Sequence, residues 1–120
     1  MVLLAGLMPY LFTALAKFGS GRPYNNHDPR DFLSKAEGKH KRANNAQMNS
    51  FEAFPLFAVG VLIAHQKLAS HHDYLLLNSL SIAFVVTRLT YGWAYLVDLP
   101  SLRSVIWFIG IVISCALYLL

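Results

Sequence analysis

The sequence predicts an all-α membrane protein in which residues 1–120 form a single domain, a bundle of four transmembrane helices. Hydrophobic residues make up 56% of the chain and charged residues only 13%, whereas a soluble domain carries about 25% charged residues. The mean hydropathy is +0.45. Four apolar runs alternate with short polar segments, and 120 residues suit four spans with short connections. We expect the spans at about residues 2–18, 43–68, 74–97 and 100–120, with no separate soluble domain.

The first apolar run covers residues 2–16 and ends at Lys17. A cleaved signal peptide is the alternative to a short first span, because Ala14-Leu15-Ala16 resembles a cleavage site. No Lys or Arg precedes the run, however, and a signal peptide normally begins with a basic region. We therefore interpret these residues as the first span.

Residues 19–41 are predicted to form a polar loop with glycines, prolines and a turn-forming segment at residues 24–30. Basic residues concentrate here, which indicates a membrane topology rather than nucleic-acid binding. Six of the ten Lys and Arg lie between the first two runs: Arg22, Arg30, Lys35, Lys39, Lys41 and Arg42. The positive-inside rule then places this loop in the cytoplasm and both termini on the opposite side.

A polar stripe opens the second span. Arg42, Asn45, Asn49 and Glu52 are three, four and three residues apart, so they share one helical face. An ionised side chain at the centre of a spanning helix costs about 3 kcal/mol even on the lenient insertion scale. This face should therefore look into the bundle or into a polar cavity.

Residues 70–73, Ser-His-His-Asp, predict a tight connection to the third span. Adjacent loop residues rarely supply enough convergent ligands, so no metal site is predicted. The third span carries Arg88, Tyr91 and Tyr95 on one helical face. An aromatic belt at the membrane surface is the alternative interpretation of the two tyrosines.

Asp98 is the predicted N-cap of a fourth span that begins at Pro100, with Arg103 and Ser104 in its first turn. The polar residues of the last three spans should thus meet on the cytoplasmic side. Such a pocket would suit a small zwitterionic or anionic ligand. The alternative, equally open at this point, is that Glu52 pairs with Arg88 and the amides only hold the helices together.

These residues resemble the signature of the MAPEG family, the membrane-associated proteins in eicosanoid and glutathione metabolism. The family pattern Arg-x-x-Arg-Ala-x-x-Asn-x-x-Glu followed by Pro is similar to residues 42–55, and the third and fourth spans also match in order. The resemblance implies a four-helix protomer, a homotrimer, and glutathione bound between neighbouring protomers. The glutathione-binding positions that it implies, together with the cations of the pocket, are Arg42, Asn45, Gln47, Asn49, Glu52, Arg88, Tyr91 and Tyr95. A cation near the end of the first span, Lys17 or Arg22, also corresponds to a glutathione contact in relatives.

Two positions depart from the family pattern. Asn45 stands where the signature has its second arginine, and Ala53 stands where the leukotriene-type pattern has tyrosine. Met48 also replaces a basic residue found in some relatives. Each change removes charge or hydrogen-bonding capacity from the expected glutathione site, so weaker glutathione binding or a different ligand is an open alternative.

The function implied is a glutathione-dependent membrane transferase or peroxidase. We expect Arg103 and Ser104 to be catalytic, the first stabilising the glutathione thiolate and the second donating a hydrogen bond to it. The second substrate would be a hydrophobic electrophile or a lipid peroxide that enters from the membrane lipid. The alternatives are a non-catalytic relative that binds lipid or glutathione, a structural membrane subunit, and an Arg103 that only anchors the helix at the interface.

Overall fold

The protein is an all-helical bundle of four long helices and one short one in the residues that the structure describes, 1–19, 21–69 and 74–120. The structure is a computed structural model. Its helices are α1 (Val2–Lys17), α2 (Pro29–Ser34), α3 (Gly38–Leu68), α4 (Leu75–Leu96) and α5 (Pro100–Leu119). By length and hydropathy α3, α4 and α5 could each cross a membrane, and α1 is a shorter apolar helix.

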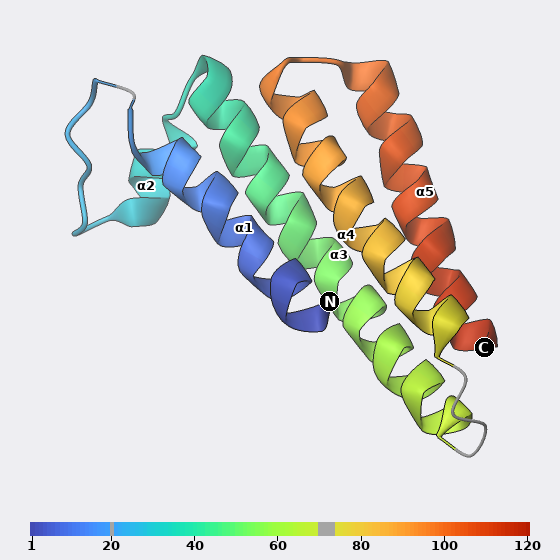
Figure 1. Ribbon diagram of the computed structural model, residues 1–120. Coiled ribbons are helices and arrows are strands. Elements are labelled where there is room, and N and C mark those ends of the chain that lie inside the picture. Colours follow the sequence, from blue (N-terminus) through green and yellow to red (C-terminus); the bar gives the residue numbers. More distant parts are fainter. Residues whose placement is uncertain (20, 70–73) are drawn as a thin grey trace.

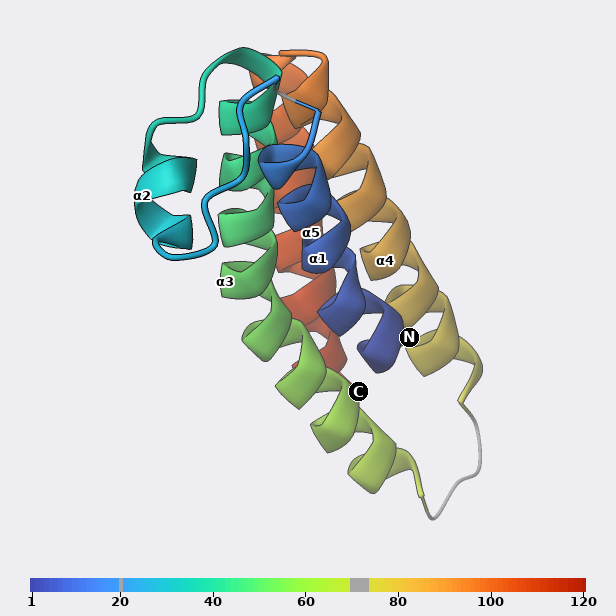
Figure 2. The ribbon, with the colours of Figure 1, turned by 90° about the vertical axis from the view of Figure 1, so that its left-hand side faces the viewer.

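The long helices lie side by side, with α3 in contact with each of the other three (Figure 1). The start of α3, the end of α4 and the start of α5 lie at one end of the bundle. The short helix α2 lies at this same end, next to the first turns of α3 (Figure 2). The predicted convergence of the three polar segments is therefore confirmed.

Small residues line the face of α3 that packs into the bundle. They recur at alternating spacings of three and four residues, the repeat of a helix that keeps one face toward its neighbours. The members are Ala43, Ala46, Ser50, Ala53, Gly60 and Ala64. Side chains of this size let helix backbones approach closely, which is how membrane helices gain packing energy without a hydrophobic driving force. Phe57 interrupts the series and stacks on Phe84 of α4, with ring centroids 3.9 Å apart.

A phenylalanine of α1 is inserted into a glycine position of α4. A Cβ atom added at Gly92 would lie only 1.9 Å from Cζ of Phe12. Both residues are buried. Any side chain at residue 92 would therefore displace the ring, so this contact fixes how α1 lies on α4.

The segment predicted as a polar loop, residues 19–41, contains more helix than we expected. Asp28 caps α2, because its side chain accepts a hydrogen bond of 3.0 Å from the backbone N–H of Asp31. Pro29 occupies the first turn, where its missing N–H costs nothing. Helix α3 begins at Gly38, five residues before the predicted start of the second span. Pro29 disfavours helix at the residue before it, and α2 begins at Pro29 itself.

Asp98 does not cap α5, contrary to the prediction. The N-cap of α5 is Leu99, and no side chain caps this helix. Asp98 has a φ of 62° and ends α4 in a Schellman arrangement, in which its N–H donates to Tyr95 O and the N–H of Leu99 donates to Ala94 O. Aspartate tolerates this left-handed conformation better than most residues. The resulting tight turn brings the end of α4 directly to the start of α5. The other predicted connection, residues 70–73, lies outside the described residues.

Candidate functional site

Three helices contribute to one cavity at the polar end of the bundle. It has a volume of about 530 Å³, within the range typical of small-molecule sites. Its lining consists of Asn49 from α3, Tyr91 and Tyr95 from α4, and Arg103, Ser104, Trp107 and Phe108 from α5. Five of the ten predicted site residues therefore meet around one space, although they come from segments more than 50 positions apart.

A second cavity, of about 200 Å³, adjoins the first and shares Asn49 and Tyr95 with it. Its remaining lining residues are Asn45, Met48 and Glu52, all on α3. Seven predicted residues thus border one of the two spaces. The carboxylate of Glu52 and the guanidinium of Arg103 line different cavities. A ligand that contacts both would have to extend past Asn49 and Tyr95.

Aromatic rings and guanidinium groups alternate along the wall formed by α4 and α5. The Cζ atom of Arg88 lies 4.3 Å from the Tyr91 ring centroid, and Cζ of Arg103 lies 4.3 Å from that of Tyr95. The two tyrosine rings meet edge to face at 5.2 Å. Contacts of this kind are favourable by about 0.5–2 kcal/mol each, and more where water is excluded. The ring of Tyr95 therefore holds the Arg103 side chain in place before any ligand arrives.

The first turn of α5 presents positive charge to the larger cavity. The N-cap residue, Leu99, makes no side-chain hydrogen bond to the helix in the described structure, so the backbone N–H groups of the first turn leave a partial positive charge there. Arg103 lies in this turn and adds a full charge. The hydroxyl of Ser104 donates to the carbonyl oxygen of Pro100 at 3.1 Å. Ser104 would have to exchange that bond before it could donate to a ligand.

Three predicted residues line neither cavity. The Nη2 atom of Arg42 donates to the carbonyl oxygen of Leu96 at 3.2 Å, so this side chain binds the end of α4. Gln47 lies off the polar stripe, and its Oε1 is buried without a hydrogen-bond partner in the described part of the chain. Arg88 is buried, with 3% of its surface exposed, and lies behind the larger cavity.

The predicted alternative in which Glu52 pairs with Arg88 is wrong. Nη1 of Arg88 instead donates to Oδ1 of Asn49 at 3.1 Å. Within the described residues Glu52 forms no ion pair, and it is exposed on the surface of the bundle. Asn49 lies three residues before Glu52 on the same face and is the residue that reaches Arg88.

Sequence reasoning did not assign the apolar wall of the site. Trp107 and Phe108 line the larger cavity, and each lies four residues after a predicted catalytic residue, Arg103 and Ser104. Helical periodicity places residues four apart on one face, so the signal was present. Met48 contributes an apolar side chain to the smaller cavity. The two aromatic side chains give the site a hydrophobic surface beside its polar groups.

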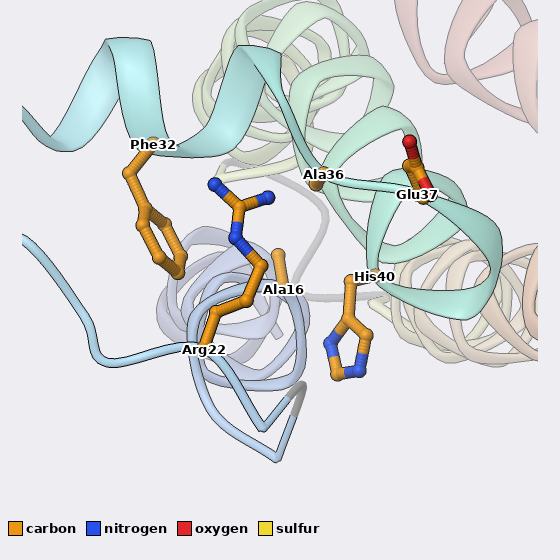
Figure 3. Close-up of a pocket in the computed structure, with 6 residues that line it drawn as sticks. All are labelled: Ala16, Arg22, Phe32, Ala36, Glu37 and His40. Carbon is orange, nitrogen blue, oxygen red and sulfur yellow. The ribbon is translucent and has the colours of Figure 1, made fainter.

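A further cavity, of about 160 Å³, lies under α2 between the end of α1 and the start of α3 (Figure 3). Arg22, Phe32, Glu37 and His40 line it together with two alanines. The guanidinium of Arg22 donates to the carbonyl oxygen of Lys35 at 2.7 Å. None of the ten predicted site residues borders this cavity. It contains Arg22, one of the two cations that the family resemblance suggests near the first helix, so that cation lies apart from the main site.

The fold defines an integral membrane protein of the helix-bundle class, with two adjoining polar cavities at one end of the bundle. A family model matches residues 1–120, the whole chain, and the protein therefore belongs to the MAPEG family. Membership supports a general role in glutathione or eicosanoid metabolism at membranes. No curated protein and no solved structure matches the chain.

Proposed function

We propose that the protein is a glutathione-dependent transferase or peroxidase of the membrane, acting on hydrophobic electrophiles or lipid peroxides. The observation that carries this proposal is the larger cavity, where a guanidinium and an uncapped helix start lie beside two exposed aromatic side chains. The polar part suits a peptide thiol and the apolar part suits a lipophilic partner.

Arg103 is the group that we assign to thiol activation. A free thiol has a pKa of about 8.5, and the thiolate is the nucleophile. Lowering that pKa by about two units requires about 2.7 kcal/mol of preferential stabilisation of the anion. A guanidinium together with the positive end of α5, in a partly dry site, supplies an effect of this size. The thiol proton leaves to water. With an electrophile, the thiolate sulfur forms a bond to the electrophilic carbon while the bond from that carbon to its leaving group breaks, and the leaving group departs with the electron pair. With a lipid peroxide, the sulfur bonds to the peroxide oxygen as the O–O bond breaks; the lipid alkoxide takes a proton from water, and a second glutathione reduces the resulting sulfenic acid to give the disulfide and water.

The two cavities suit the two ends of glutathione, whose carboxylates and ammonium group require opposite partners. Glu52 in the smaller cavity has no cationic partner among the residues that the structure describes, so it can bind the ammonium group. Asn45 and Asn49 beside it offer amide hydrogen bonds. Glu52 would then bind the ligand and take no part in proton transfer.

We propose in addition that the protein is a homotrimer and that the site is completed by a neighbouring protomer. The support is the exposure of Glu52 on a helix long and apolar enough to span a membrane. A carboxylate facing lipid would cost about 2.5–3.5 kcal/mol even by insertion scales. A second copy of the chain packed against this face would remove that cost. Native mass spectrometry in detergent that finds only monomers would contradict the trimer.

The test of the function is glutathione binding to detergent-purified protein, followed by calorimetry and by the ultraviolet absorbance of the thiolate. We expect a thiolate signal for the parent protein and its loss in Arg103→Ala, with affinity reduced about tenfold. Arg30→Ala, which removes an exposed arginine of α2, is the matched control and should change neither measurement. If Arg103→Ala binds and activates the thiol as the parent does, Arg103 has no catalytic role.

The second candidate is a relative that binds glutathione or lipid without chemistry. The observation that favours it is Ser104, whose hydroxyl proton is already donated to Pro100 O, together with Asn45 in place of the second signature arginine. Binding of glutathione without thiolate absorbance supports this candidate. Absence of any binding supports a structural membrane subunit.

A further inference from the structure

Arg88 is a buried cation whose charge has no acidic partner in the described residues. It lies on α4 with 3% of its surface exposed. Its Nε and Nη2 atoms are buried without hydrogen-bond partners in the described part of the chain. Within the described residues Nη1 makes the single hydrogen bond of the side chain, to Oδ1 of Asn49 at 3.1 Å. The bond crosses from α4 to α3 directly behind the larger cavity.

This hydrogen bond determines which way the Asn49 amide faces. A guanidinium has five N–H donors and no acceptor, so it can only be approached by the oxygen of an amide. The oxygen of Asn49 is therefore directed to Arg88, and its –NH₂ group is directed elsewhere. Asn49 borders both cavities, and within the described residues its nitrogen donates to no protein atom. Two N–H donors are thus left for a ligand.

The guanidinium has neighbours on three sides. Its position is therefore fixed, and it can hold the Asn49 amide in one orientation. It lies over the ring of Tyr91 at 4.3 Å and over that of Phe84 at 5.8 Å. On the third side α5 has a glycine, and a Cβ atom at Gly110 would lie 3.4 Å from Nη2 of Arg88. The small residue leaves room for the planar group between α4 and α5.

We propose that Arg88 is a positioning and specificity-determining residue that acts through Asn49. By fixing the amide, it makes the centre of the site a hydrogen-bond donor that selects a ligand group with acceptor oxygens, such as a carboxylate or a peptide carbonyl. The unpaired positive charge behind the amide favours a carboxylate further. This inference rests on the ligand site of the proposed function. In this arrangement Arg88 does not contact glutathione itself. It orients Asn49, and Asn49 contacts the ligand.

A merely structural arginine would hold α3 and α4 together and leave ligand affinity unchanged in the folded protein. The two roles are separated by a double-mutant cycle with Arg88→Met and Asn49→Ala. Glutathione affinity is measured by calorimetry on the full chain in detergent, well below the melting temperature of each variant. We expect Arg88→Met to weaken binding about tenfold when Asn49 is present, the size expected for one hydrogen bond to a charged group.

In the Asn49→Ala background the same substitution should weaken binding less than about twofold, because the residue through which Arg88 acts is gone. Equal losses in both backgrounds would show that Arg88 acts on the ligand by another route. No loss in either would leave only a structural role, and either result overturns the proposal. Arg88→Lys, which keeps a donor and the charge, should recover part of the affinity.

Asn49→Asp tests the contact between residue 49 and Arg88 without any ligand. Its carboxylate keeps an acceptor for Arg88 and supplies the missing counter-charge, so the melting temperature should be equal to that of the parent or higher. The same variant replaces ligand-facing donors by an acceptor and should bind glutathione at least about tenfold more weakly. Asn44→Asp, on the same helix but bordering neither cavity, is the control for added charge.

These two measurements also separate this inference from the proposed function. If the parent does not bind glutathione, the proposed function fails, and the melting temperature of Asn49→Asp still decides whether residue 49 faces Arg88. A clear decrease in that temperature would mean that the side chain of residue 49 does not contact the Arg88 guanidinium. That outcome overturns the inference whatever the ligand is.

Discussion

The insertion of Phe12 into the Gly92 position gives the most direct test of the packing. Gly92→Ala would place a Cβ atom 1.9 Å from Cζ of the ring and 2.4 Å from Cε1. Carbon atoms attract at about 3.5–4.0 Å, so the ring would have to move by at least about 1.5 Å. The ring is buried, with 6% of its surface exposed, so a shift of this size would displace its neighbours. The Phe12 side chain must therefore move away from its position against Gly92.

The size of the effect follows from two opposing contributions. Loss of the buried position of a phenylalanine costs about 1.5–3 kcal/mol. Alanine in a helix interior is favoured over glycine by about 0.8–1 kcal/mol. The net destabilisation expected for Gly92→Ala is about 0.5–2 kcal/mol, or several degrees in melting temperature for a chain of this size.

The assay is thermal unfolding in detergent, followed by circular dichroism. Gly6→Ala is the matched control, because its Cβ atom would lie 3.2 Å from the outer atoms of the Phe54 ring and a small shift relieves the contact. Adding Phe12→Leu to Gly92→Ala shortens the inserted side chain and should recover part of the loss. A Gly92→Ala protein that melts within about one degree of the parent, with no effect of Phe12→Leu, would refute the packing argument.

Three further predictions concern the turn between α4 and α5, the contact between His40 and Leu15, and the membrane topology. Asp98→Gly should stabilise the protein by about 0.5–1 kcal/mol and Asp98→Val should destabilise it by about 1–2 kcal/mol, because residue 98 has a positive φ; detergent melting curves of the two variants measure this. His40→Ala should lower the melting temperature, because Nδ1 of His40 lies 2.8 Å from the carbonyl oxygen of Leu15 and such a bond contributes about 0.5–1.5 kcal/mol; glutathione affinity should stay unchanged, and calorimetry would reveal any link to the main site. Asn26→Cys in a Cys115→Ser background should react with a membrane-impermeant thiol reagent from the cytoplasmic side only, and labelling from the opposite side would reverse the topology expected from the positive-inside rule.

Helical periodicity is sufficient to predict which residues of α3 and α4 line the two cavities together. The spacing of Asn45, Asn49 and Glu52 fixes their common direction whatever the neighbours are, and the structure places all three on one cavity. The same reasoning placed Tyr91 and Tyr95 together, and they line the larger cavity. The convergence of the helix ends followed from the alternating direction of successive spans.

Depth within the bundle could not be predicted in the same way. Periodicity gives the direction of Arg88 but not whether its guanidinium reaches a cavity or stops behind it. That depends on residues of other helices that pack around the guanidinium, among them Gly110 of α5, whose Cβ position lies 3.4 Å from Nη2. The role of Asp98 was missed for a related reason. The residue is suitable both as an N-cap and as a left-handed terminal residue, and the geometry of the α4–α5 turn decides between them.

The choice of Asn49 over Glu52 as the partner of Arg88 has a consequence for ligand binding. An ion pair between Glu52 and Arg88 would neutralise both groups, and a ligand would have to break it before using either. In the observed arrangement the buried cation is bound by a neutral amide, and the carboxylate remains available at the edge of the smaller cavity. Charges held apart in this way need little rearrangement when a zwitterion binds, and preorganisation of this kind reduces the cost of association. An ion pair between Glu52 and Arg88 is the simplest structural explanation of the polar stripe. The proposed function requires that this ion pair does not form.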